Sequence, residues 1–250
     1  MCIRDRFHRE TVSGRPELLS IIVPVYNEAA TSRAVIDRLL AIDLPLAREI
    51  LVVNDGSTDR TGDVLDQAAR ERLPIVVLHV HPNAGKGSAI RHGLARARGS
   101  IVAIQDADLE LDPGQLASLV EPILRGAADV VYGSRFARGR SGAPLLTYAA
   151  NRLLTVATNL LFGAALTDME TCYKVMRIEV ARSLQLSAER FDIEPQITAR
   201  LLRRGRRVHE VPVRYDPRSR RQGKKIRWRD GVHALQVLLR ERCRARPFAS

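Results

Sequence analysis

The residues with the clearest capacity for chemistry are two aspartates, Asp106 and Asp108, at the end of a short apolar segment. Residues 101–104 are Ile-Val-Ala-Ile, a pattern that predicts a buried strand. In extended backbone, residues two apart point to the same side, so both carboxylates can reach one hard cation. Mg²⁺ typically takes one or two protein carboxylates and leaves its other positions to water and substrate phosphates. An isolated Asp-x-Asp is more often a pair of solvated loop residues, so the choice between a metal site and a solvated loop depends on the surrounding sequence.

The chain before this pair alternates between predicted strands and predicted helices. Strands are expected at 20–25, 49–53 and 75–80, and helices at 32–41, at 61–72 and up to about residue 98. This alternation predicts a mainly parallel sheet with helices on both faces, in which ligands bind beyond the carboxyl ends of the strands. Polar residues gather at those ends, namely residues 26–28, Asp55, Lys86 and the Asp106 and Asp108 pair.

The second half of the chain is less regular. Strands are expected at 129–132 and 208–215, and helices at 115–124, 144–166, 194–204 and 232–240. We expect a single α/β domain over residues 18–231, a disordered segment over residues 1–17, and a C-terminal amphipathic helix and tail over residues 232–250.

Positive charge is concentrated in one part of the sequence. The formal net charge is +12, and residues 200–229 hold thirteen Lys and Arg against two acidic residues. Such a tract is expected to bind a polyanion, which can be nucleic acid, an anionic membrane surface or a phosphorylated substrate. The alternative is that these residues are solvated surface charges without a partner. Aromatic residues make up only 4% of the chain, which is poor for stacking on bases and argues against nucleic acid.

Several common site types are excluded. The three cysteines are far apart and form no CxxC or Cys/His cluster, which argues against a zinc site or a disulfide framework and fits a reducing compartment. No run of about 20 apolar residues predicts a membrane-spanning helix. A P-loop fails at residues 80–88, because Val80 stands where that motif needs glycine. Lys86 near a helix N-terminus can still hold a phosphate, with a solvated lysine as the equal alternative.

Four segments, in this order, resemble the successive signatures of family 2 glycosyltransferases: residues 20–28, 53–59, 83–87 and 106–108. The resemblance implies the GT-A fold, a nucleotide-binding α/β sandwich whose mainly parallel central sheet is flanked by helices. Four later segments resemble the dolichyl- or polyprenyl-phosphate sugar synthase branch of that family: residues 133–135, 166–175, 193–195 and 223–231.

The resemblance also implies roles for individual residues. Those implied to bind the nucleotide-sugar donor are Pro24, Tyr26, Glu28, Asp55, Lys86, Asp106 and Ala107. Those implied to ligate Mg²⁺ or Mn²⁺ at the donor diphosphate are Asp106, Asp108 and Glu110. Those implied to bind the acceptor and its phosphate are Ser134, Arg135, Arg218, Arg220 and Lys224. Catalytic roles are implied for Asp108, Arg135 and Asp168.

The activity implied is metal-dependent, inverting transfer of a hexose from GDP-mannose or UDP-glucose to polyprenyl or dolichyl phosphate. We expect a cytoplasmic enzyme associated peripherally with the anionic membrane face, with no nucleic-acid partner. One alternative is a saccharide hydroxyl acceptor, which would need a carboxylate base such as Asp168. A remote alternative is a nucleic-acid-binding protein that uses the tract at residues 200–229.

Overall fold

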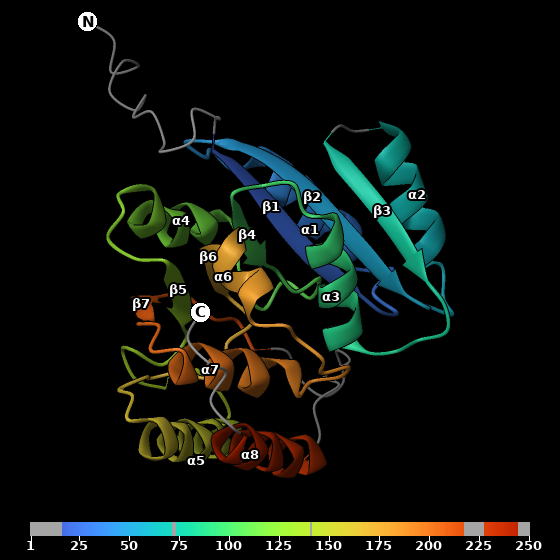
Figure 1. Ribbon diagram of the computed structural model, residues 1–250. Helices are drawn as coiled ribbons and strands as arrows, with labels where there is room; N and C mark the ends of the chain where they lie inside the picture. The colour runs from blue at the N-terminus through green and yellow to red at the C-terminus, as the bar shows by residue number, and fades with distance from the viewer. Residues whose placement is uncertain (1–16, 72–73, 141, 218–227, 245–250) are drawn as a thin grey trace, which may run out of the picture.

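The computed structural model describes residues 17–71, 74–140, 142–217 and 228–244, and its strands form one seven-stranded sheet (Figure 1). The strands are β1 (Leu18–Val25), β2 (Ala47–Asp55), β3 (Ile75–Val80), β4 (Ile101–Ile104), β5 (Val130–Ser134), β6 (Lys174–Arg177) and β7 (His209–Pro212). The helices are α1 (Ser32–Ala41), α2 (Thr61–Glu71), α3 (Lys86–Arg96), α4 (Leu116–Leu124), α5 (Leu145–Phe162), α6 (Ile178–Ser183), α7 (Ile193–Arg203) and α8 (Trp228–Cys243).

The order of the strands in the sheet is β3-β2-β1-β4-β6-β5-β7. Strands β3, β2, β1 and β4 are parallel neighbours, and β5 pairs in parallel with β7. The prediction of a mainly parallel α/β sheet is therefore confirmed. The sequence did not predict β6, which runs antiparallel between β4 and β5 and joins the two parallel groups.

Alternating apolar side chains fill the two faces of the sheet. On β1, Ile21 and Val23 pack on one face, whereas Ile22 packs on the other. Helices α1, α2 and α4 supply the buried side chains of the first face, and α3, α6 and α7 supply those of the second. Near-continuous apolar strands are expected when both faces are covered, which explains the apolar stretches within β1, β2 and β4.

Helices α5 and α8 form a further layer against α7, on the side of α7 away from the sheet (Figure 1). A small core that includes Met169, Ala199 and Leu238 lies between these helices. Within the described residues, no helix is both long enough and apolar enough to cross a membrane.

Residues 1–16, and with them nearly all of the predicted disordered segment, lie outside the described residues. Glu17 is described, and its carboxylate lies 2.8 Å from the Arg177 guanidinium. At the other end, α8 spans more of the chain than the predicted helix at 232–240, and its Glu241 carboxylate is 2.8 Å from Arg200 of α7.

A close backbone approach brings the start of α3 against the segment that leads into α7. The Ser88 amide donates to the Glu189 carbonyl at 2.9 Å. A Cβ placed on Gly87 would lie 2.5 Å from the Ala188 carbonyl oxygen, far inside normal contact. Only glycine therefore fits at position 87, and the approach sets how Lys86 of α3 meets the first turn of α7.

We predict that Gly87→Ala lowers the free energy of unfolding by about 1–3 kcal/mol, because the backbone of residue 188 must move to admit the methyl group. Urea denaturation followed by circular dichroism measures the change. Gly62→Ala is the matched control, since Gly62 also lies in a helix but its added Cβ would meet nothing closer than 3.5 Å. Equal stability of the two variants would contradict the close approach.

Candidate active site

The two aspartates singled out from the sequence lie just beyond the carboxyl end of β4. Asp106 is bound by Lys86, whose ammonium lies 2.8 Å from Oδ1 and 3.0 Å from Oδ2. Burial raises the pKa of the Asp106 carboxyl, but the charge and hydrogen bond of Lys86, together with Cys172 and the charge of Arg135, outweigh burial and hold that pKa below its usual value. The Asp108 Oδ1 accepts a hydrogen bond from the Glu110 amide at 3.1 Å. Asp106 is therefore held as an anion at the rim of the sheet.

The donor set at this rim fits Mg²⁺ or Mn²⁺, because both aspartates offer the hard oxygen ligands that these cations prefer. Among the described residues, no three acidic, His or Cys side chains gather into a group that would hold a metal by itself. Asp106 and Asp108 would thus supply the protein ligands, and water and phosphate oxygens the rest. Glu110 as a third ligand stays a prediction.

Asp55, at the end of β2, is buried and organises the loop before α3. Its carboxylate accepts hydrogen bonds from the Asn83 side chain at 2.8 Å and from the amides of Ala84 and Gly85 at 3.0 and 2.6 Å. The loop in turn delivers Lys86 to Asp106. This contact gives Asp55 a positioning task, and its predicted role in binding the donor stays a prediction.

The residues that follow β1 are connected to the aspartate pair. The Thr31 hydroxyl lies 2.8 Å from the Glu28 carboxylate and 2.8 Å from the Ala107 carbonyl. Glu28 and Ala107, both predicted to bind the donor, are therefore brought to one place. Pro24 is buried within β1 and Tyr26 is half-buried just beyond it, at the same edge of the sheet.

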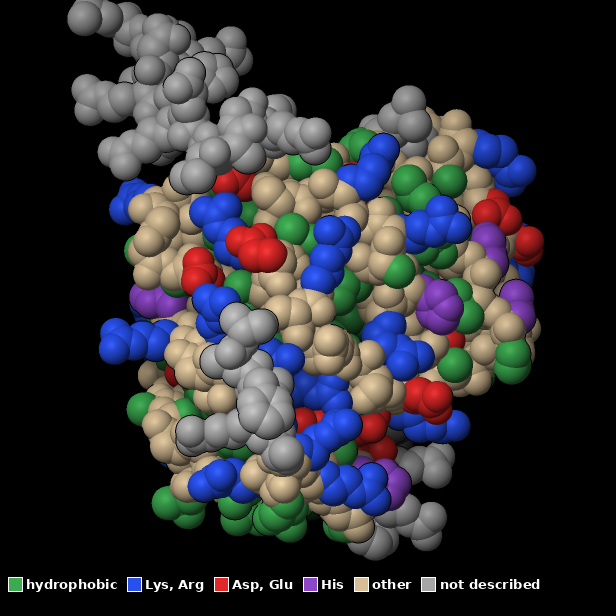
Figure 2. Space-filling model, viewed as in Figure 1, with side chains coloured by type: hydrophobic (Ala, Val, Ile, Leu, Met, Phe, Trp, Pro, Cys, Tyr) green, Lys and Arg blue, Asp and Glu red, His purple; other side chains and the backbone are tan. Residues whose placement is uncertain are grey.

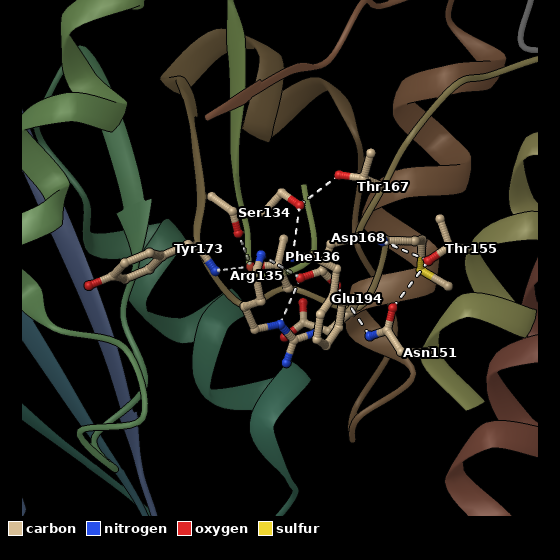
Figure 3. A network of polar contacts seen from close by, with 12 residues as sticks. Ser134, Arg135, Phe136, Asn151, Thr155, Thr167, Asp168, Tyr173 and Glu194 are labelled. Carbon is tan, nitrogen blue, oxygen red and sulfur yellow. Dashed lines mark hydrogen bonds and ion pairs between the residues drawn. The ribbon is translucent and has the colours of Figure 1, made fainter. Parts of the chain in front are cut away.

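A buried ion pair forms the second part of the site, at the end of β5 (Figure 3). Asp168 is fully buried and accepts from the Arg135 guanidinium twice, at 2.7 Å from Nε and 2.8 Å from Nη2. The Arg135 amide and the Asn151 side chain of α5 add hydrogen bonds of 3.0 and 3.2 Å. Asp168 raises the pKa of the Arg135 guanidinium against the effect of burial, so the arginine is a fixed cation.

This geometry bears on the prediction that Asp168 is catalytic. Both of its oxygens are engaged with Arg135 and Asn151, and its side chain has no exposed surface. A general base must present an oxygen to the proton that it removes. The structure therefore offers no support for Asp168 as a base, and we assign it the positioning of Arg135.

The neighbours of the ion pair complete a polar network. The Ser134 hydroxyl lies 2.6 Å from that of Thr167, and the Glu210 carboxylate of β7 accepts from the backbone amides of Thr167 and Asp168 at 2.8 and 3.1 Å. Ser134 lies in this network, and its predicted role in binding the acceptor stays a prediction. Glu210 is a residue that sequence reasoning missed.

Tyr215 lies between the two parts of the site, which the sequence did not reveal. The Arg135 guanidinium lies over the rings of Phe136 and Tyr215, 5.1 and 5.3 Å from their centroids. Burial and the neighbouring Glu110 and Asp108 carboxylates raise the pKa of the Tyr215 hydroxyl, although Arg135 opposes them. The aspartate rim and the arginine are therefore close together. Its place within the basic tract at residues 200–229 was the only signal in the sequence.

The basic tract at residues 200–229 lies partly outside the described residues. Arg218, Arg220 and Lys224 lie outside the described residues, so their predicted phosphate contacts stay predictions. Lys86, predicted to bind phosphate, is instead engaged with Asp106 and with Glu194 of α7, 2.7 Å away.

Glu170 is a second acidic residue near the arginine. One of its oxygens, Oε1, is buried and accepts no hydrogen bond from any described residue. Burial, together with the nearby charge of Glu194, raises the pKa of the Glu170 carboxyl to about 7, although Lys174 and Arg135 oppose the shift. Glu170 therefore changes charge near neutral pH at the edge of the site.

Comparison with known proteins agrees with this geometry. Residues 20–184 match the family model described as Glycosyl transferase family 2. The chain is 31% identical over 210 residues to the undecaprenyl-phosphate mannosyltransferase of Micrococcus luteus. This alignment covers 79% of this chain and 83% of that protein. It is also 31% identical over 210 residues to the undecaprenyl-phosphate 4-deoxy-4-formamido-L-arabinose transferase of Pseudomonas aeruginosa, over 83% of this chain but only 59% of that protein.

A solved structure supports the fold. The glucosyl-3-phosphoglycerate synthase of Mycobacterium tuberculosis, crystallised with Mn²⁺, UDP and glucosyl-3-phosphoglycerate, superposes with a TM-score of 0.68. The match covers 91% of this chain and 80% of that chain, at 23% sequence identity. The predicted family and the predicted GT-A fold are confirmed.

We predict that Glu170→Gln stabilises the protein at neutral pH but not at acidic pH. The folded pKa of about 7 lies above the ordinary value of 4.5, so the unfolded chain loses the proton first as the pH rises and wild-type stability falls between these values. The free energy of unfolding of the variant, relative to that of the wild type, should therefore rise by about 1–3 kcal/mol between pH 4.5 and pH 7. Urea denaturation across this range measures the difference, with Glu179→Gln on an exposed side chain as control. A difference that does not vary with pH would contradict the assignment.

Proposed function

Because the chain belongs to glycosyl transferase family 2, we propose that it transfers a hexose from a nucleotide-diphosphate sugar to the phosphate of a polyprenyl or dolichyl phosphate. The observation that carries this proposal is the arginine at the end of β5, fixed by buried Asp168, beside the two carboxylates at the end of β4. One part of the site suits a cation and a donor diphosphate, and the other suits an acceptor anion.

Arg135 is built to receive an anion. Asp168 takes up Nε and Nη2 of the guanidinium, and no described residue accepts a hydrogen bond from Nη1. The side chain is only 14% exposed, so an anion that meets it is largely shielded from water. Charge-assisted hydrogen bonds from arginine to phosphate are among the strongest in proteins.

A phosphate acceptor matches the absence of an available base at Asp168. The second pKa of a phosphate ester is about 6, so its oxygen is largely anionic at neutral pH and needs no proton removed. That oxygen would form the bond to the anomeric carbon while the bond from this carbon to the donor diphosphate breaks, with inversion. Arg135 would orient the acceptor and reduce its repulsion from the donor.

The divalent cation, Mg²⁺ or Mn²⁺, would be held by Asp106 and Asp108 and would supply charge neutralisation at the departing diphosphate. GDP-mannose and UDP-glucose are the donors that we propose first, and mannose agrees with the name of the Micrococcus relative. The Pseudomonas relative, named for a modified arabinose, shows that similar chains are named for different sugars.

The outer helix α5 favours an acceptor that lies in a membrane. Its buried side chains are polar, Asn151, Thr155 and Thr158, whereas Leu153 and Leu160 are 72% and 81% exposed. On the neighbouring α8, Val232, Leu235 and Leu239 are also exposed. Figure 2 shows these helices' edge of the molecule lined by hydrophobic side chains, with Lys and Arg side chains directly above them.

We propose that this apolar face of α5 and α8 lies in the headgroup region of an anionic bilayer. An apolar helix face bordered by cations is the pattern of a helix that lies in the membrane interface. Asn151, on the opposite side of the same helix, donates to Asp168. A lipid phosphate at Arg135 would therefore be one helix away from the membrane that holds its chain.

The hydroxyl-acceptor alternative receives no such support, because its base would be Asp168, whose oxygens are engaged. The nucleic-acid alternative does not explain the ordered rim of Asp106 and Asp108.

We predict that the protein moves radiolabel from a nucleotide sugar into the organic phase when polyprenyl phosphate and Mn²⁺ or Mg²⁺ are present. Asp108→Ala should lower this transfer by roughly 10²–10³-fold, the cost of losing a group that stabilises charge at the reacting centre. Asp112→Ala is the control, since Asp112 is an exposed aspartate that follows the same strand. Undiminished transfer by Asp108→Ala would refute the metal assignment.

A separate prediction concerns the apolar face. The double variant Leu153→Asp/Leu160→Asp should bind phosphatidylglycerol vesicles more than about tenfold more weakly in a sedimentation assay, because two exposed leucines no longer enter the bilayer. Val76→Asp, on an exposed valine of β3, should bind as wild type does. Unchanged vesicle binding by the double variant would contradict the membrane assignment. It would also be contradicted if the wild-type protein formed a dimer in solution and the double variant were a monomer.

A further inference from the structure

A line of alternating charges runs through the protein behind the aspartate rim. Lys174 lies 3.6 Å from Glu194, Glu194 lies 2.7 Å from Lys86, and Lys86 lies 2.8 Å from Asp106. Their side chains are 0%, 5%, 12% and 27% exposed in that order, so the line leads from the interior to the site. The four residues come from β6, α7, the start of α3 and the end of β4, and meet only in the folded protein.

Glu194 is held by charge alone. Neither of its carboxylate oxygens takes a hydrogen bond of normal geometry from a described residue, although both are buried. Its partners are the two ammonium groups of Lys86 and Lys174. A buried carboxylate without neutral donors is costly unless its charge is needed where it lies. No step of the proposed transfer uses Glu194 directly.

Lys86 lies between the carboxylates of Asp106 and Glu194, of which only Asp106 is a proposed metal ligand. It lies within 3.0 Å of both oxygens of Asp106, the same atoms that would ligate a divalent cation. An ammonium that had Asp106 as its sole partner would compete with the cation for those oxygens. Glu194, 2.7 Å away on the other side, offers Lys86 a second anion.

We propose that Glu194 is a positioning residue that acts through Lys86 and sets how freely Asp106 can bind the divalent cation. With Glu194 present, the charge of Lys86 is shared and Asp106 is oriented but still able to accept a metal. Without the Glu194 charge, Lys86 pairs with Asp106 alone and opposes the metal. This inference rests on the metal site of the proposed function and adds to it a control that lies behind the ligands.

The test measures binding of Mn²⁺ alone, with no donor or acceptor present, by the electron paramagnetic resonance signal of free Mn²⁺. Glu194→Gln should weaken Mn²⁺ binding by about tenfold, the scale found for groups that orient metal ligands. Lys86→Met should change binding in the opposite direction, because it removes the competing ammonium. Opposite shifts from two variants of one buried ion pair are not what a merely structural role would produce.

The double variant Lys86→Met/Glu194→Gln removes one charge of each sign and keeps the test available if Glu194→Gln does not fold. If Glu194 acts through Lys86, the loss caused by Glu194→Gln should largely vanish in the Lys86→Met background. Glu241→Gln is the matched control, because Glu241 is also a buried partner of α7, through Arg200, but lies away from the rim. It should leave Mn²⁺ binding unchanged.

Three outcomes would overturn the inference. The first is an equal Mn²⁺ affinity of Glu194→Gln and wild type, and the second is an equal loss of Mn²⁺ affinity on Glu194→Gln in the wild-type and Lys86→Met backgrounds. Either would show that Glu194 does not act through Lys86, and neither would contradict the metal site itself. Wild-type binding of Mn²⁺ that Asp108→Ala leaves unchanged removes the proposed metal site, and the inference with it. The failure of the inference alone is thus distinguishable from the failure of the proposed function.

Discussion

The site depends most on the buried pair of Arg135 and Asp168. A buried ion pair adds little net stability, because the cost of removing both charges from water offsets their attraction. Its effect here is positional, since Asp168, which is itself held by a hydrogen bond from Asn151, accepts two hydrogen bonds from the guanidinium and leaves it one orientation. The rings of Phe136 and Tyr215 confine it further. A cation held this firmly can meet an incoming anion without reorganising.

The fold brings groups of opposite charge to the two parts of the site. The parallel strands β1, β2 and β4 end at one edge and present carboxylates there, whereas β5 ends beside them and presents the arginine. The antiparallel strand β6 makes this possible, because it lies between β4 and β5 and carries buried Lys174. The charge line from Lys174 to Asp106 thus follows from the topology as much as from the side chains.

The sequence predicted most of the first half of the fold because its strands contain short apolar stretches that alternate with clear helices. It did not predict β6, whose first residue is a lysine with no exposed surface and whose segment lacks an alternating pattern. It identified α5 but could not show which face is buried, since Asn151 and Thr155 turn inward whereas Leu153 and Leu160 are exposed. Contacts such as Lys86 with Glu194 join residues over a hundred positions apart, which no local spacing reveals.

In the proposed site, a metal held by Asp106 and Asp108 and an acceptor phosphate at Arg135 are neighbours. The most direct measurement is the phosphorus relaxation of a short-chain polyprenyl phosphate in the presence of the enzyme, Mn²⁺ and a nucleoside diphosphate. We expect Mn²⁺ to accelerate the relaxation of the acceptor phosphorus in the wild-type enzyme and Arg135→Ala to abolish this effect. Acceptor binding without any effect of Mn²⁺ on its phosphorus would show that the metal and the acceptor phosphate are not neighbours.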